Sequence, residues 1–140
     1  MQPLFRVWFS IIALSTVCHA EIHPSPHLVL AANYPKLALF AGIEGTVKAK
    51  CRVRDDGSVI DVTIVNGPSL LVEEVESNLG RWVFDPPGKG DAAEITVTYR
   101  FAFRGYCDHH IGCRQESWFE YPDKVIIVAE RPHADTLDSQ

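Results

Sequence analysis

The sequence predicts an α+β domain in which two helices pack on one face of a small antiparallel sheet of three to four strands. One observation behind this prediction is a strand hairpin around Asp56-Gly57. The second is a long strand of alternating apolar residues over 93–103, and the third is an amphipathic helical segment between the hairpin and that strand. The length of 140 residues is consistent with a single domain.

The N-terminal residues 1–20 have the composition of a secretory signal peptide. Arg6 is the only charged residue among them, and the weakly polar run over 7–17 is too short to span a bilayer comfortably. The small residues Cys18 and Ala20 predict cleavage before Glu21, and therefore a periplasmic or otherwise exported protein. An uncleaved anchor in the inner membrane is the alternative, and it is the only membrane association that we expect.

A short lead over residues 21–33 precedes the domain, and residues 27–32 can add an extended piece to it. Pro35 suits the start of a helix, because the N–H that proline lacks is not needed there. A short helix is therefore predicted over Lys36–Ala41, and Gly42 suits the position just past its end.

The first two strands form a hairpin in which apolar residues alternate with polar ones from Gly45 onward. Residues 55–58 supply the turn, and the second strand runs over 59–65. Its residues expected to face the core are Ile60, Val62 and Ile64. The opposite face of the first strand is basic, and Asp61 and Glu94 are expected to balance part of its charge. That basic stripe consists of Lys48, Lys50, Arg52 and Arg54. We interpret it as a solvated face, and the alternative is a surface that binds an acidic partner or anionic lipid headgroups.

The second helix is expected to begin at Ser69, whose side chain can cap it by accepting a backbone N–H bond. Its apolar residues recur every four positions, at Leu71, Val75 and Leu79. Trp82 and Phe84 are spaced as on a strand and are expected to pack in the core, where they join the helix exit to the sheet.

The third strand, residues 93–103, places Ile95, Val97, Tyr99, Phe101 and Phe103 on one face. A polar loop follows, and the β-prone residues 124–130 predict a fourth strand. Residues 132–140 are expected to form a flexible tail.

Three cysteines follow the predicted cleavage site. Cys107 and Cys113 lie six positions apart in the polar loop, so a disulfide is expected in an exported protein. The alternative is a zinc or copper site formed by the same two thiols and His109 or His110. Cys51 lies in a strand pattern and is expected to be a buried apolar residue.

Composition and charge exclude several classes of function. The formal net charge of −5 repels the phosphates of nucleic acids. The acidic pairs Asp55-Asp56 and Glu73-Glu74 lie in a predicted turn and on a helix surface, where solvation explains them. No nucleophile has an identifiable base, and no phosphate-binding loop is present. The chain is therefore not expected to be an enzyme, and no cofactor is expected.

Four blocks of sequence, in matching order and spacing, resemble the C-terminal domain of TonB. They are Tyr34-Pro35 with residues 42–47, residues 53–65 around Asp56-Gly57, residues 79–86 with the Trp-x-Phe-x-Pro pattern at Trp82, and residues 95–103. Residues 34–103 are thus identified as a TonB C-terminal-like domain, and residues 104–131 add the cysteine loop and the fourth strand.

The resemblance implies a periplasmic module that captures an extended segment of an outer-membrane transporter as an added strand. By this analogy the binding edge lies on the third strand, at Thr96, Val97, Thr98, Tyr99 and Arg100.

The predicted fourth strand leaves a second function open. If residues 124–130 pair with the third strand, they occupy the edge that the family uses. The alternative is then a self-capped structural or adaptor domain of the cell envelope. A metal-handling protein that uses the loop between Cys107 and Cys113 is a further alternative.

Overall fold

The computed structural model describes residues 24–88, 92–108 and 112–133. The predicted signal peptide, its cleavage site and most of the predicted tail lie outside the described residues. In chain order the elements are β1 (Pro26–Leu28), α1 (Lys36–Ala41), β2 (Gly45–Val53), β3 (Val59–Asn66), α2 (Ser69–Leu79), β4 (Val83–Phe84), β5 (Ala93–Cys107), β6 (Gln115–Glu120) and β7 (Lys124–Pro132).

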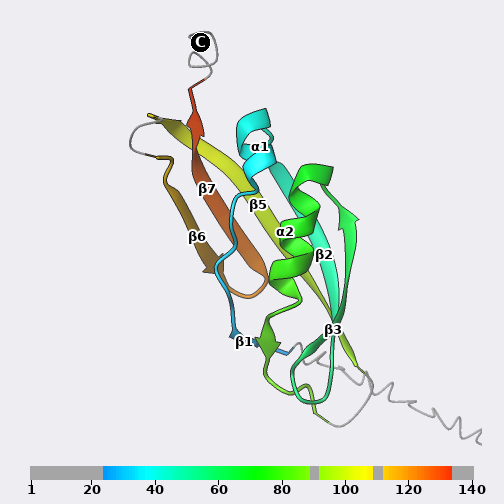
Figure 1. Ribbon diagram of the computed structural model, residues 1–140. Coiled ribbons are helices and arrows are strands. Elements are labelled where there is room, and N and C mark those ends of the chain that lie inside the picture. The colour runs from blue at the N-terminus through cyan, green and yellow to red at the C-terminus, as the bar shows by residue number, and fades with distance from the viewer. Residues whose placement is uncertain (1–23, 89–91, 109–111, 134–140) are drawn as a thin grey trace, which may run out of the picture.

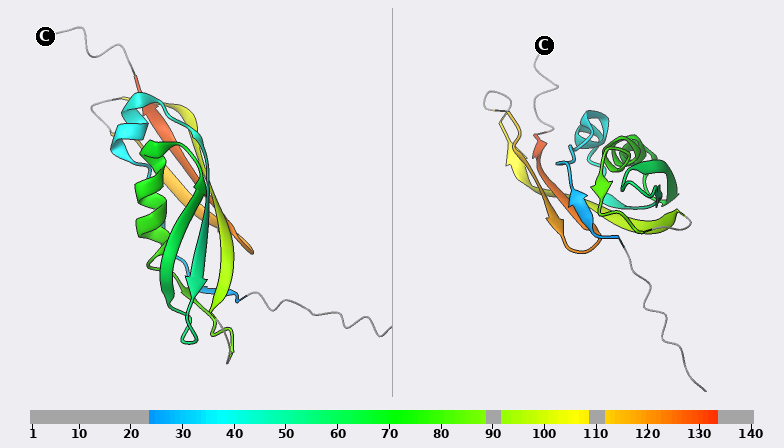
Figure 2. Two further views of the ribbon diagram at one scale, coloured as in Figure 1. Left: turned by 90° about the vertical axis from the view of Figure 1, so that its right-hand side faces the viewer. Right: turned by 90° about the horizontal axis from the view of Figure 1, so that it is seen from below.

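The main sheet has five strands in the order β3-β2-β5-β7-β6, and a small ladder joins β1 to β4. Both helices lie on the same face of the main sheet (Figure 1). The view along the sheet in Figure 2 shows the helices on one side and no described element over the other. The predicted α+β class, with two helices on one face, is confirmed.

The sheet is larger than expected, and it is mixed instead of antiparallel. β7 lies between β5 and β6, parallel to β5 and antiparallel to β6. β6 is the strand that the sequence did not predict, because its short, largely polar sequence has only Trp118 and Phe119 as strong strand formers. Two parallel strands need a connection that returns the chain to the end of the sheet at which the first strand begins. β6, which runs antiparallel to β7, is part of this connection between β5 and β7.

The hairpin of β2 and β3 differs from its prediction at one residue. The register shifts between Arg52 and Val53, so that Val53 pairs with Val59. Ile60 is therefore turned outward and is 40% exposed, whereas Val59 packs against the core. The prediction that Ile60 faces the core was wrong, because a bulge reverses the alternation and the sequence does not mark it.

A glycine is required where the hairpin meets β4. Gly57 has φ of +88°, and its carbonyl accepts a hydrogen bond from the N–H of Phe84 at 2.8 Å. A Cβ atom at this position would lie 1.9 Å from the Phe84 carbonyl oxygen. Both the backbone conformation and this close approach exclude any other residue.

The two helices begin after prolines. α1 follows Pro35 and ends at Gly42, whose φ of 66° is left-handed, as expected. α2 follows Pro68, and Ser69 is already its first residue and makes no capping bond. The expected cap at Ser69 was wrong, because Pro68 holds the extended conformation of the position before the helix.

The core lies between the helices and the sheet and is centred on Trp82, Phe84, Tyr99 and Phe101, all of which are buried. Each side chain that was expected in the third strand's inward face is buried or half-buried. The ring of Trp82 contacts that of Phe119 edge-on, with centroids 5.6 Å apart, so the core continues under β6.

One polar residue, Asn78, lies inside this core with no exposed area. Its Oδ1 accepts hydrogen bonds from Trp82 Nε1 at 3.0 Å and from the Tyr99 hydroxyl at 2.9 Å. Its Nδ2 donates to the carbonyls of Leu30 and Ala31 at 3.2 and 3.1 Å. Asn78 thus joins the segment before α1 to α2 and β5.

Candidate protein-binding edge

The expected binding residues on β5 fall into two groups, which β7 separates. The pairing of β5 with β7 begins at Thr98 and Lys124 and continues with Arg100 and Ile126. The N–H of Thr98 donates to the Asp123 carbonyl at 2.8 Å. Thr98, Tyr99 and Arg100 therefore run beside the chain's own strand, whereas Thr96 and Val97 precede it.

The strand β7 is a constituent of the core. Val125, Ile127 and Ala129 are at most 2% exposed. Exposing Val125 and Ile127 alone costs about 3–6 kcal/mol, which is comparable to the total stability of a small domain, about 5–15 kcal/mol. Displacing β7 without replacing these side chains would therefore cost much of the stability of the domain.

On the side of β7, the first residues of β5 pair with no strand in the part of the chain that the structure describes. Because Thr98 directs its N–H toward β7 and backbone direction alternates along a strand, Glu94 and Thr96 direct their N–H and C=O groups to the same side. The pairing with β7 has not yet begun there. Among the described residues, no strand pairs with these four backbone groups.

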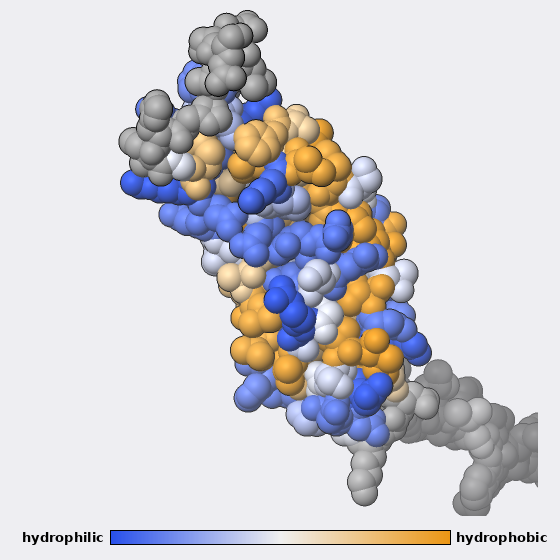
Figure 3. All heavy atoms as spheres, in the orientation of Figure 1, coloured by the Kyte–Doolittle hydropathy of each residue, from blue (hydrophilic) through white to orange (hydrophobic). Residues whose placement is uncertain are grey.

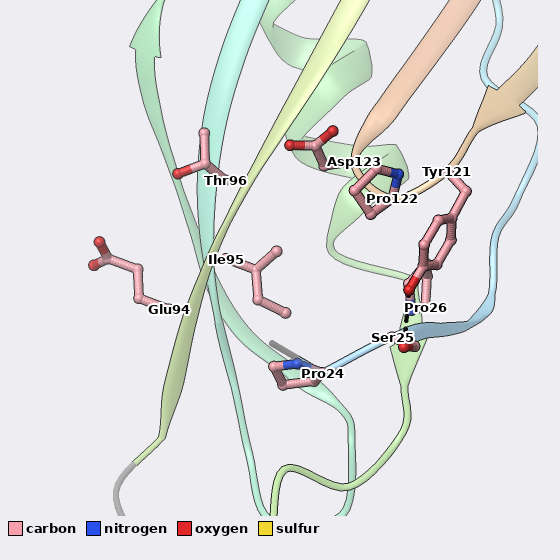
Figure 4. A pocket seen from close by; sticks show the side chains of 9 residues that line it. All are labelled: Pro24, Ser25, Pro26, Glu94, Ile95, Thr96, Tyr121, Pro122 and Asp123. Carbon is pink, nitrogen blue, oxygen red and sulfur yellow. Dashed lines mark hydrogen bonds between the residues drawn. The ribbon is translucent and has the colours of Figure 1, made fainter. Parts of the chain in front are cut away.

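These backbone groups border a hollow of about 430 Å³. Its walls are residues 24–26 on one side, residues 94–96 of β5, and residues 121–123 of the turn between β6 and β7 (Figure 4). Ser25 Oγ and the Tyr121 hydroxyl lie 3.4 Å apart across it, and Tyr121 is 73% exposed. The surface is largely proline, tyrosine and isoleucine, which suits an extended peptide.

The sequence did not indicate this hollow. The hollow is lined by two segments that lie far apart in the chain, one with Pro24 and Pro26 and the other with Tyr121 and Pro122. They meet only because β6 and β7 return beside β5.

The cysteines have the expected arrangement. Cys107 and Cys113 form a disulfide, which links the end of β5 to the segment before β6. The alternative metal site would need those two sulfurs, and its histidines, His109 and His110, lie outside the described residues. Within residues 24–88, 92–108 and 112–133, no three His, Cys, Asp or Glu side chains are grouped to hold a metal ion.

Cys51 is buried beneath the helices, as expected. Burial raises the pKa of its thiol to about 12, and the charges of Asp61 and Glu94 add to this effect. The reactive thiolate is therefore scarcely populated near neutral pH.

The helix face carries exposed apolar side chains. Figure 3 shows hydrophobic patches that alternate with hydrophilic ones over this face. Leu37 and Phe40 of α1 are 71% and 64% exposed, and Leu70 at the start of α2 is 39% exposed. No helix in the described part of the chain is long and apolar enough to cross a membrane.

The comparison with protein-family models agrees with the resemblance. The chain matches the family model described as the Gram-negative bacterial TonB protein C-terminal over residues 31–104. A solution NMR structure of the Pseudomonas aeruginosa TonB CTD is similar at 22% identity, covers 60% of this chain and 88% of that chain, and has a TM-score of 0.46. No curated protein matches the chain. Because the family model matches more than half of its residues, the chain belongs to the TonB C-terminal family.

Proposed function

We propose that this chain is a protein-binding module of the periplasm that captures an extended segment of an envelope protein, such as an outer-membrane transporter of TonB-dependent uptake. The observation that carries the proposal is the start of β5, where Glu94 and Thr96 present backbone groups beside the hollow that pair with no strand of the described chain. Family membership supports the class of function. The part of the expected edge that β7 occupies, at Thr98 to Arg100, takes no part in capture.

Strand addition at this position is short, and its affinity is correspondingly modest. Each intermolecular backbone hydrogen bond contributes about 0.5–1.5 kcal/mol. Apolar side chains of the bound segment contribute further by covering Pro24, Tyr121 and Pro122. Specificity then comes from the shape of the hollow.

A second candidate is a self-capped adaptor that uses no strand edge. The pairing of β7 with β5 favours it, because that pairing closes most of the edge. In this case the partner contacts the exposed apolar side chains of the helix face, at Leu37, Phe40 and Leu70.

Photocrosslinking in intact cells separates the two candidates. A photoreactive phenylalanine derivative replaces Tyr121, which lines the hollow, and, as a matched control, replaces Tyr106, an exposed tyrosine of β5 outside it. Capture predicts a crosslink from position 121 to an extended segment of an outer-membrane protein and none from position 106. Crosslinks from a photoreactive residue at Phe40, and none at Tyr121, would reject capture in favour of the adaptor.

Export is tested on the same material. The proposed cleavage predicts a mature N-terminus at Glu21 in the periplasmic fraction, which intact-mass measurement detects. A full-length chain in the membrane fraction would instead support the uncleaved anchor.

A further inference from the structure

Two acidic side chains line the hollow beside the start of β5. They belong to Glu94 of β5 and to Asp123, the residue before β7 (Figure 4). Among the described residues, no lysine, arginine or histidine lines it. A carboxylate at the edge of a largely apolar hollow favours a cationic group of a ligand and repels an anionic one.

Only one of these carboxylates is paired with a cation. Glu94 Oε1 lies 2.7 Å from Lys50 Nζ. Asp123 is exposed and forms no ion pair with any described residue. The basic residue that follows it, Lys124, pairs with Glu120 at 3.2 Å. The charge of Asp123 is therefore the one in the hollow that is left for a ligand.

Asp123 lies where an added strand would end. Its carbonyl accepts a hydrogen bond from the Thr98 N–H at 2.8 Å, and the pairing of β5 with β7 begins at the same place, with Thr98 opposite Lys124. A segment paired with residues 93–97 would therefore continue the line of β7. At about 3.3 Å per residue, this stretch of β5 holds about five residues of the segment. One end of the bound segment thus lies beside Asp123.

Alternation along the strand defines where the segment makes its apolar contact. Ile95 and Val97 are buried on the helix side of the sheet. A residue of the segment opposite Ile95 directs its side chain to the same side. There it meets Pro24 and Tyr121, which line the hollow together with Ile95 (Figure 4). An apolar residue is therefore favoured at this position.

We propose that the captured segment carries a lysine or arginine at the end beside Asp123 and an apolar residue two positions further along, opposite Ile95. This inference rests on the proposed capture at the start of β5 and adds the chemistry of its ligand. One ion pair and the shape of the hollow then select the ligand together.

The test uses the peptide Lys-Thr-Val-Thr-Lys, blocked at both ends. Lysine at both ends serves either strand direction, and valine takes the position opposite Ile95. In one control peptide glutamine replaces both lysines, and in another serine replaces the valine. Binding to the isotope-labelled full chain is followed by the NMR shifts of the Glu94 and Thr96 amides, which also locate the peptide.

Three variants test the role of Asp123. Asp123→Asn removes the charge and keeps the backbone carbonyl that binds Thr98. Its matched control, Asp55→Asn, changes an exposed aspartate of the hairpin turn, which does not line the hollow. Asp123→Lys reverses the charge and is combined with a peptide in which glutamate replaces both lysines. Both positions are exposed, so far-UV circular dichroism should be unchanged.

The lysine peptide should bind the unmodified chain and Asp55→Asn alike. Asp123→Asn, or glutamine in the peptide, should weaken binding about two- to fivefold, as expected for an exposed ion pair. Added salt should reduce this difference. Serine in place of valine should weaken binding about tenfold. Asp123→Lys should bind the glutamate peptide more tightly than the lysine peptide.

Two results would overturn the proposal and leave capture itself intact. One is equal binding of the lysine and glutamine peptides to the unmodified chain, and the other is equal weakening in Asp123→Asn and Asp55→Asn. If no peptide shifts the Glu94 and Thr96 amides, the proposal is also wrong. The crosslink from position 121 then decides separately whether capture occurs.

A second copy of the chain is another occupant that the same experiment detects. If the amides of Glu94 and Thr96 shift with protein concentration alone, and sedimentation shows a dimer, the hollow binds another copy. That result would refute the proposed basic segment.

Discussion

Replacing Asn78 with alanine should destabilise the domain by about 4 kcal/mol. Its Oδ1 is the acceptor for two buried donors, Trp82 Nε1 and the Tyr99 hydroxyl. Each donor left unsatisfied costs about 1–3 kcal/mol. The carbonyls of Leu30 and Ala31, which lose Nδ2, lie near solvent and add less. Urea denaturation followed by far-UV circular dichroism measures the change in the free energy of unfolding.

Two variants control this experiment. Ser77→Ala changes the preceding, exposed residue of α2 and should alter the stability by less than about 0.5 kcal/mol. Tyr99→Phe removes one donor but leaves the Asn78 acceptor bonded to Trp82, so its loss should be about 1 kcal/mol. If Asn78→Ala costs less than about 1 kcal/mol, or no more than Tyr99→Phe, the network does not stabilise the core as described.

Gly57→Ala should cost about 3 kcal/mol or more, because the new Cβ meets a carbonyl oxygen and φ is positive; a midpoint of urea unfolding close to that of the unmodified chain would contradict this. Cys51 should resist iodoacetamide at pH 8 until urea unfolds the chain, because its pKa is about 12; rapid labelling of the native chain would show that the thiol is accessible. Replacing Cys107 and Cys113 with serine should lower the stability by about 2 kcal/mol, since the bridge closes a short loop, and unchanged thermal unfolding would show that the bridge is dispensable. Ile127→Ala should cost about 2–5 kcal/mol; a loss below about 1 kcal/mol would mean that β7 is not part of the core.

The parts of the fold that follow from local sequence could be predicted. The alternation in β2 and β5, the turn at Gly57 and the proline before α1 each depend on residues close together in the chain. Trp82 and Phe84 were assigned to the core for the same reason, and both are buried.

The features that were missed depend on tertiary pairing. The reversed alternation at Ile60 follows from a register shift that no residue announces. β6 has too few strand-forming residues to be predicted, yet it is stabilised as the antiparallel partner of β7. Asn78 lies in an amphipathic helix pattern where an asparagine is usually exposed, and only the positions of Trp82 and Tyr99 explain its burial.

The candidate binding surfaces illustrate the same division. The sequence pointed to β5, but the place where coverage of its edge begins, at Thr98, depends on where β7 starts to pair. The basic stripe of β2 was also visible in the sequence, and the expected partial balance of its charge is observed, because Lys50 pairs with Glu94 and Arg52 with Asp61.

Hydrogen exchange of individual β5 amides, read by NMR, tests most directly where β7 covers this strand. We expect the N–H groups of Thr98 and Arg100, which face β7, to exchange only on global unfolding. Those of Glu94 and Thr96, which face the same side before β7 begins, should exchange orders of magnitude faster. If Thr98 and Arg100 exchanged as fast as Thr96, β7 would not close this edge, and the whole stretch from Thr96 to Arg100 would be open to a partner.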